Sequence, residues 1–110
     1  MPINFPDIFN SLKQGVSDLA ETSLKNFVGQ AKSDGQNILD SMKNNLQDWT
    51  TQLANGEIST ADFKFLVLGQ KDLLEMVALK QAGLLLVQID EFKNGVLNLI
   101  VNTITGAIKI

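Results

Sequence analysis

Four residue types are missing from the sequence: histidine, cysteine, tyrosine and arginine, so all nine basic residues are lysine. Without cysteine the chain can form no disulfide, no thiolate nucleophile and no thiolate-bound metal site. Without histidine it has neither the commonest general base nor the commonest metal ligand at neutral pH. Without arginine it cannot make the bidentate contacts that recognise phosphate, carboxylate or guanine. We therefore expect a non-enzymatic protein with no catalytic residues, no cofactor and no metal site.

Charge and hydropathy exclude further classes of protein. The 110 residues carry a net charge of −3 and are 45% hydrophobic. The acidic balance disfavours binding to nucleic acid or to an anionic membrane, and the length suits a single domain, 1–110. The longest uncharged stretch, 94–108, is shorter than the about 20 apolar residues of a membrane-spanning helix. The N-terminus shows no basic region followed by a long apolar one, so it does not resemble a secretory signal and a cytoplasmic location is the default expectation.

Turn and cap signals divide the chain near its middle. Asn55-Gly56 is a strong turn dipeptide. Ser59, with Asp62 three residues later, has the pattern of a capping box at the start of a helix. Near the other end, Pro6 fits the first turn of a helix, where its missing N–H costs nothing. Because no proline lies between these points, the sequence favours two long helices with a short turn at 55–59.

An eleven-residue repeat of apolar positions runs through both halves. Eleven residues make three helical turns, so the repeating positions share one helix face. We predict an all-α fold in which two long helices, about 5–54 and about 60–108, pack as an antiparallel hairpin. In the first half the repeat comprises Phe5, Val16, Phe27, Ile38 and Trp49, together with Phe9, Ala20, Ala31, Met42 and Leu53. In the second half it comprises Phe63, Leu74, Leu85, Val96 and Ala107, together with Val67, Ala78, Ile89 and Ile100.

Glycines leave two features of this prediction open. The apolar repeat keeps its phase across Gly35, which favours an unbroken first helix over a break near Gly29–Gly35. The residues after Gly95 are rich in β-branched side chains, so 96–110 could form a strand or a separate short helix instead. The second-half glycines mark either close helix contacts or pairing with bulky side chains across the bundle. They are Gly69, Gly83, Gly95 and Gly106.

The two halves differ in apolar content, and this difference predicts assembly. Residues 60–110 contain 28 apolar residues, against 21 in 1–59. One amphipathic partner cannot cover a helix that is apolar on several sides. We therefore expect self-association, most simply as a two-fold dimer that forms a four-helix bundle, and another protein could also be a partner. The expected oligomer interface comprises Leu74, Leu85, Ile89, Phe92, Val96 and Ile100. Leu85→Asp should then break the assembly or unfold the chain, and Lys13→Ala should do neither.

The remaining candidate sites fit ordinary structural roles better than chemistry. Carboxylates at i and i+3 without further loop ligands are more typical of a solvated helix face than of a cation site. Trp49 lies on the apolar repeat near the central turn, where a core role is expected. The pairs at i and i+3 are Asp18 with Glu21 and Asp72 with Glu75. Asp90 and Glu91 are adjacent, so they do not share a helix face and are not a catalytic pair.

These observations favour a structural or interaction protein, a homo-oligomeric helical bundle that serves as an assembly subunit or partner-binding module. One alternative is a membrane- or lipid-associating protein that uses the apolar tail after Gly83, which the acidic charge disfavours. A second alternative is a small, signal-less secreted helical hairpin. In size, acidity and absence of cysteine the chain is similar to the general build of the WXG family of such exports. It departs from that family at the defining Trp-x-Gly turn, since Trp49 is followed by Thr50 and Thr51.

Overall fold

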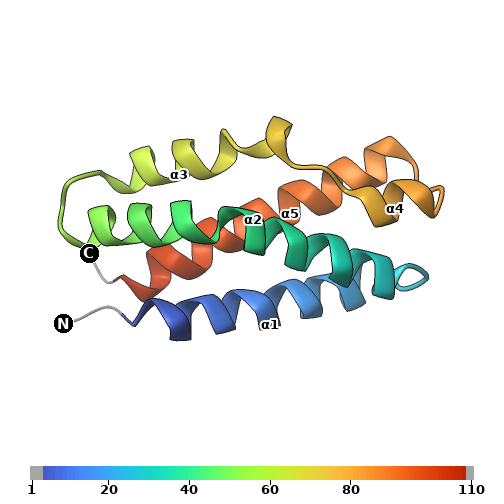
Figure 1. Cartoon of the computed structure of the whole chain (residues 1–110), viewed down its shortest axis with the longest axis horizontal. Helices are drawn as coiled ribbons and strands as arrows, with labels where there is room; N and C mark the ends of the chain where they lie inside the picture. Colours follow the sequence, from blue (N-terminus) through green and yellow to red (C-terminus); the bar gives the residue numbers. More distant parts are fainter. Residues whose placement is uncertain (1–3, 109–110) are drawn as a thin grey trace.

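The computed structural model describes residues 4–108 and confirms the all-α class (Figure 1). Five α-helices and one 3-10 turn follow one another along the chain. They are α1 (Phe5–Ser23), α2 (Val28–Ala54), α3 (Thr60–Leu68), η1 (Lys71–Leu73), α4 (Val77–Gln81) and α5 (Leu86–Ala107). The alternative of a strand after Gly95 is wrong within the described residues, because α5 continues to Ala107; Lys109 and Ile110 lie outside them.

The first predicted helix is broken in two. A continuous helix over 5–54 would be about 75 Å long, whereas the longest extent of the molecule is 43 Å. The chain leaves α1 at Ser23, turns through 24–27 and returns along α1 as α2 (Figure 1). The turn is held by the N–H of Leu24 donating to the Ala20 carbonyl at 3.1 Å and that of Phe27 donating to Leu24 at 2.9 Å. The break thus precedes Gly29–Gly35, and α2 runs through both glycines.

The second predicted helix is also wrong between residues 69 and 85. There the chain forms only η1 and the short helix α4 before α5 begins at Leu86. Gly69 caps the C-terminus of α3, and Gly83 follows α4 with φ +86°, a left-handed conformation that glycine adopts without strain. The predicted hairpin is therefore replaced by a chain that reverses direction several times.

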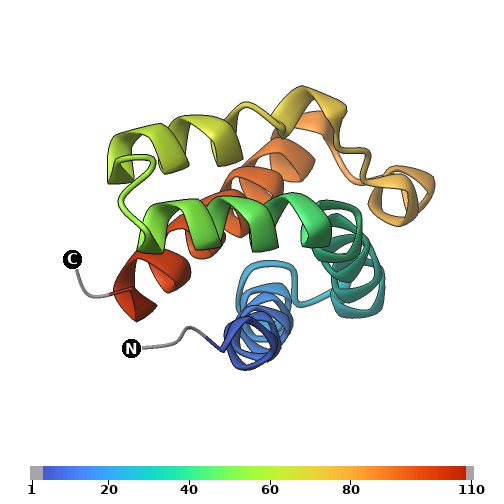
Figure 2. The ribbon, with the colours of Figure 1, turned by 60° about the vertical axis from the view of Figure 1, so that its left-hand side comes forward.

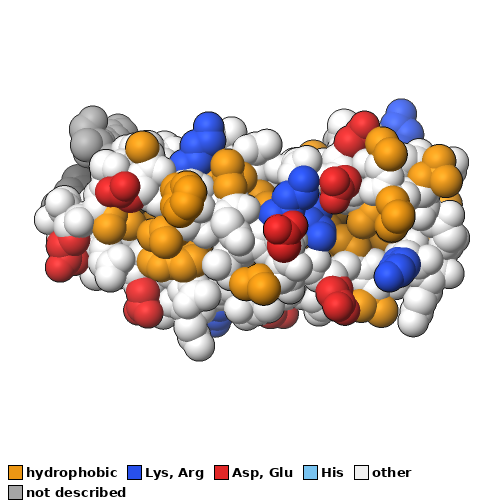
Figure 3. Space-filling view, turned by 90° about the horizontal axis from the view of Figure 1, so that it is seen from above, with side chains coloured by type: hydrophobic (Ala, Val, Ile, Leu, Met, Phe, Trp, Pro, Cys, Tyr) orange, Lys and Arg blue, Asp and Glu red, His pale blue; other side chains and the backbone are white. Residues whose placement is uncertain are grey.

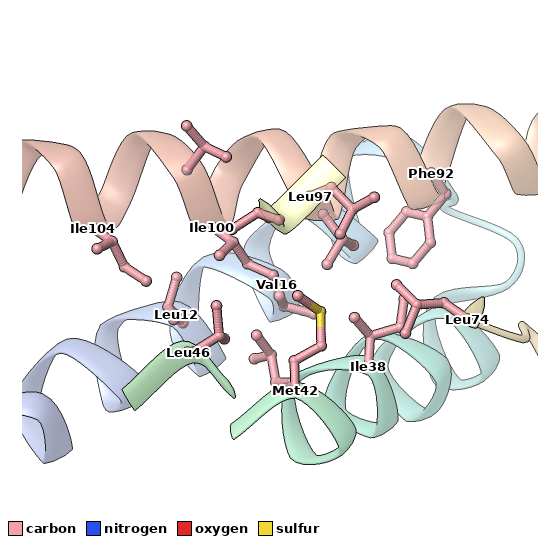
Figure 4. Close-up of a cluster of buried hydrophobic side chains, with 14 of the residues drawn as sticks. Leu12, Val16, Ile38, Met42, Leu46, Leu74, Phe92, Leu97, Ile100 and Ile104 are labelled. Carbon is pink, nitrogen blue, oxygen red and sulfur yellow. The ribbon is translucent and has the colours of Figure 1, made fainter. Parts of the chain in front are cut away.

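Helices α1, α2 and α5 surround a common core, and α3 lies across α2 and α5 (Figures 1 and 2). Leu12 and Val16 from α1 meet Ile38 and Met42 from α2 and Ile100 from α5 (Figure 4). The buried hydrophobic side chains of the described residues form one cluster. The sequence suggested that two chains would be needed to bury so much apolar surface, but several helices of one chain already provide this interior.

Two glycine–leucine contacts bring α1 and α5 together. A Cβ on Gly15 would lie 3.0 Å from a Leu99 methyl group, and a Cβ on Gly95 would lie 3.2 Å from a Leu19 methyl group. Each glycine thus leaves room for a leucine of the facing helix. At Gly95 the structure therefore supports the pairing of a glycine with a bulky side chain across the bundle.

The central turn and the cap that follows it are confirmed. Gly56 has φ +75°. The N–H of Asp62 donates to the Ser59 hydroxyl at 3.0 Å, and the N–H of Ser59 donates to the Asp62 carboxylate at 3.1 Å. These reciprocal hydrogen bonds form the capping box that starts α3.

The capping box makes the stability of the protein depend on pH. The hydrogen bond from the Ser59 backbone, followed by that involving its side chain, lowers the pKa of the Asp62 carboxyl. Because the folded-state pKa is depressed, this stabilisation is complete above the unfolded-state pKa and is lost as the pH falls through the folded value. Asp62→Asn should therefore lose less stability than the unmodified protein as the pH falls below the ordinary aspartate pKa of 3.8. Urea unfolding at several pH values, followed by Trp49 fluorescence, measures the free energy of unfolding of the variant and of the unmodified protein. Equal pH profiles for the two would contradict a contribution of the Asp62 carboxylate.

Candidate functional site

The structure places five of the six predicted interface residues in the core of a single chain. Side chains that are already covered offer no surface to a second chain unless the fold opens. The five buried residues are Leu74, Ile89, Phe92, Val96 and Ile100. Leu85 differs, since 68% of it is exposed. Of the six residues, Leu85 alone has its side chain on the surface of the single chain.

The exposed large hydrophobic side chains come from one segment of the chain, and we call the surface that they form the apolar face. Within residues 4–108 all of them fall between 65 and 87, in α3, η1, α4 and the start of α5. Viewed from above, hydrophobic side chains lie over α3 and again toward the α4 end of the molecule, with lysine and acidic side chains between the two groups (Figure 3). By contrast, α1 and α2 expose no large hydrophobic residue among those described. The apolar face consists of Phe65, Leu73, Val77, Leu85, Leu86 and Val87.

A groove of about 700 Å³ opens beside α4 and shares Val77, Leu86 and Val87 with the apolar face. Its size falls in the range of small-molecule sites, about 300–1,000 Å³. We call it the α4 groove. Its apolar lining is Leu74, Met76, Val77, Leu86, Val87 and Ile89, and its polar lining is Glu75, Lys80, Gln81, Asp90 and Lys93.

Two lysine side chains connect α5 to η1 at one wall of the groove. The Lys93 ammonium donates to the Leu74 carbonyl at 2.6 Å and to the Lys71 carbonyl at 3.2 Å, which ties α5 to η1. The Lys71 ammonium lies 3.4 Å from the Asp90 carboxylate. Asp90 is thus the ion-pair partner of Lys71. Within residues 4–108 no carboxylate lies within ion-pair distance of Lys93.

A buried carboxylate on α2 holds α4 in place beside the groove. Asp34 is 1% exposed and accepts hydrogen bonds from the N–H groups of Ala78 at 3.0 Å and Leu79 at 2.8 Å. These are free donors in the first turn of α4, so Asp34 caps that helix from a distant part of the sequence. A helix as short as α4 is not stable by itself. Sequence analysis missed this role, although Asp34 lies three residues after Ala31 and four before Ile38, on the buried face.

The acidic pairs and Trp49, the other candidates from the sequence, form no site in the structure. Asp18 accepts from the Gln14 amide and Glu21 pairs with Lys32 at 2.7 Å, so the two acids have separate partners. Asp72, Glu75, Asp90 and Glu91 are exposed. Trp49 is half-buried against the core, as expected. Residues 4–108 contain no group of three or more acidic side chains that could hold a metal ion.

The helices of the described region include none with the length and apolarity required to cross a bilayer. The described residues thus present the apolar face, the α4 groove with its charged rim, and a buried carboxylate that holds α4 in place. No protein-family model matches the sequence, and no curated protein or solved structure matches the chain.

Proposed function

We propose that the protein is a non-enzymatic assembly module that self-associates through the apolar face. The observation that carries this proposal is the confinement of the exposed large hydrophobic residues to 65–87. Burying a large aliphatic side chain contributes about 1.5–3 kcal/mol, so several on one surface favour association. The proposal keeps the cytoplasmic location expected from the sequence.

The distribution of charge favours a second copy of the chain as the partner. Residues 1–59 contain seven acidic residues and four lysines, a net charge of −3. Residues 60–110, which include the apolar face, contain five of each and are neutral. Two copies that meet through this half avoid the repulsion between their acidic halves. A two-fold interface is self-complementary, so a surface with equal numbers of both charges suits it.

Leu85→Asp tests this proposal without damaging the fold. Leu85 occupies the N-cap position of α5 with φ −64° and ψ 144° and makes no side-chain cap hydrogen bond. Aspartate is a preferred N-cap residue, so the substitution should stabilise the monomer by about 0.5–2 kcal/mol. The same carboxylate would be buried at the interface, so the dimer dissociation constant should rise by about tenfold or more. Because Leu85 is exposed in the single chain, we do not expect Leu85→Asp to unfold it.

Sedimentation equilibrium and urea unfolding measure the two effects separately. Lys13→Ala is the control, because Lys13 is exposed on α1, and its ammonium shares the Phe9 ring with that of Lys43, each 5.2 Å from the ring centre. This variant should dissociate like the unmodified protein. An unchanged dissociation constant for Leu85→Asp would rule out an interface at the start of α5.

A further inference from the structure

The α4 groove combines an apolar lining with a partly buried lysine, Lys93, that has no carboxylate within ion-pair distance among the described residues. Counted with Lys71, three lysines face two carboxylates at the groove. Asp90 is paired with Lys71, whereas Glu75 and Lys80 are both exposed and form no ion pair with each other. These groups carry a net charge of +1, and of the two lysines that line the groove only Lys93 is partly buried.

The Lys93 ammonium is fixed in position. It is partly buried and donates to the carbonyls of Leu74 and Lys71. An ammonium has three N–H donors, so one remains. Lys93 lines the groove together with Leu74, whose carbonyl lies 2.6 Å from the ammonium. Carbonyl groups hold the ammonium without cancelling its charge, so it attracts an anion strongly where water is partly excluded.

The apolar lining lies beside this cation. Leu74, Met76 and Ile89 are 8%, 4% and 7% exposed, and they form a floor between α4 and α5. Leu86 and Val87, at 74% and 68%, form a side that stands open to solvent. A hydrocarbon chain on this surface would cover apolar area that water now contacts, which stabilises the complex.

We propose that the α4 groove binds a single-chain amphiphile with an anionic head group. The hydrocarbon chain lies on Leu74, Met76 and Ile89 and against Leu86, and the carboxylate accepts a hydrogen bond from the Lys93 ammonium. This inference concerns a single chain; because Val77, Leu86 and Val87 belong to both the groove and the apolar face, self-association would compete with the ligand for them.

Isothermal titration calorimetry with dodecanoate, below its micelle concentration, tests the proposal on the full chain. We expect one site per chain. Dodecyltrimethylammonium has the same hydrocarbon chain with a positive head group, and should bind about tenfold or more weakly because it gains no contact with Lys93. Acetate, which has the head group alone, should not bind measurably. Equal affinity for the two amphiphiles would overturn the proposal.

Substitutions then locate the ligand. Lys93→Met keeps the apolar stem of the side chain and should lower the affinity for dodecanoate by about tenfold. Lys80→Met, at the rim of the groove, should leave the affinity for dodecanoate nearly unchanged. An equal loss of affinity in both variants would overturn the assignment of the head group to Lys93. Circular dichroism shows whether Lys93→Met keeps its helices.

Two leucines provide a pair of variants that does not depend on Lys93. Leu86 and Leu73 are each 74% exposed, but only Leu86 lines the groove. Leu86→Gln should weaken dodecanoate binding several-fold and Leu73→Gln should not. Equal effects would show binding to the apolar face in general and would overturn the groove site. The solution mass of each sample is measured in parallel, so that altered association is not mistaken for altered ligand affinity.

Discussion

Asp34→Ala should lower the free energy of unfolding by about 2–4 kcal/mol. The substitution removes the acceptor for two N–H groups at the start of α4, those of Ala78 and Leu79. Each buried donor that loses its partner costs about 1–3 kcal/mol, and the desolvation cost of the carboxylate, relieved in the variant, offsets part of this loss. Because α4 loses the hydrogen bonds that anchor its first turn, its amide protons should also exchange faster with solvent.

Asp40→Ala is the matched control for this prediction. Asp40 lies on the same helix but is exposed, so its removal should change the free energy of unfolding by less than about 0.5 kcal/mol. Asp34→Asn keeps one acceptor oxygen, so its loss of free energy of unfolding should lie between those of Asp34→Ala and Asp40→Ala. Urea unfolding followed by Trp49 fluorescence gives the free energies, and hydrogen exchange gives the local effect. If Asp34→Ala and Asp40→Ala give the same free energy of unfolding and the same hydrogen-exchange rates, the Asp34 carboxylate does not hold α4.

Gly35→Ala should lower the free energy of unfolding by about 1–3 kcal/mol, the usual cost of overpacking a core. A Cβ at residue 35 would lie 2.3 Å from Cγ1 of Val16 and 3.7 Å from Cζ of Phe92. Val16 is fully buried and its branched side chain has little freedom to turn away. The overlap therefore outweighs the gain of up to about 1 kcal/mol that alanine brings to a helix interior.

Gly29→Ala is the matched control, since a Cβ there meets no atom within 4 Å and residue 29 lies in the same helix. Its effect should be neutral or slightly stabilising. A double-mutant cycle with Val16→Ala provides the sharper test. The two substitutions should be non-additive, because removing the valine methyl groups makes room for the alanine at 35. Strict additivity would mean that the close approach of α1 and α2 does not limit residue 35.

The apolar repeat of the first half predicted burial correctly although the predicted helix is broken. Val16, Ile38 and Met42 are buried, and Phe27 and Trp49 are half-buried against the core. Periodicity indicates which face of a helix is covered, and two antiparallel helices that pack on each other cover the same face as one continuous helix would. The reversal at residues 24–27 contains neither proline nor glycine, so its sequence gave no strong turn signal.

In the second half the same repeat fails at Leu85. Phe63, Leu74 and Val96 are buried, whereas Leu85 is 68% exposed. The break lies between Gly69 and Gly83, two glycines whose place in the sequence suits either close helix contacts or pairing with bulky side chains. Gly83 instead adopts a left-handed conformation that ends α4. Pattern analysis did not reveal this, because a glycine within an apolar segment fits a helix contact as well as a turn.

The candidate site depends mostly on contacts between distant residues. The surplus of apolar residues in 60–110 predicted an exposed hydrophobic surface, and the apolar face lies in that half. Asp34 and Ala78 are 44 residues apart, and Lys93 reaches the Lys71 carbonyl across 22 residues. Such pairings follow from how the helices reverse, which the helical periodicity of the sequence does not specify.

Light scattering coupled to size exclusion, over a concentration series of the unmodified chain, tests the central claim most directly. Self-association through the apolar face predicts a mass that rises from 12.0 kDa towards twice that value as the concentration increases. A mass that stays at 12.0 kDa at the highest concentrations would contradict it, and would mean that the exposed residues between 65 and 87 remain in contact with water.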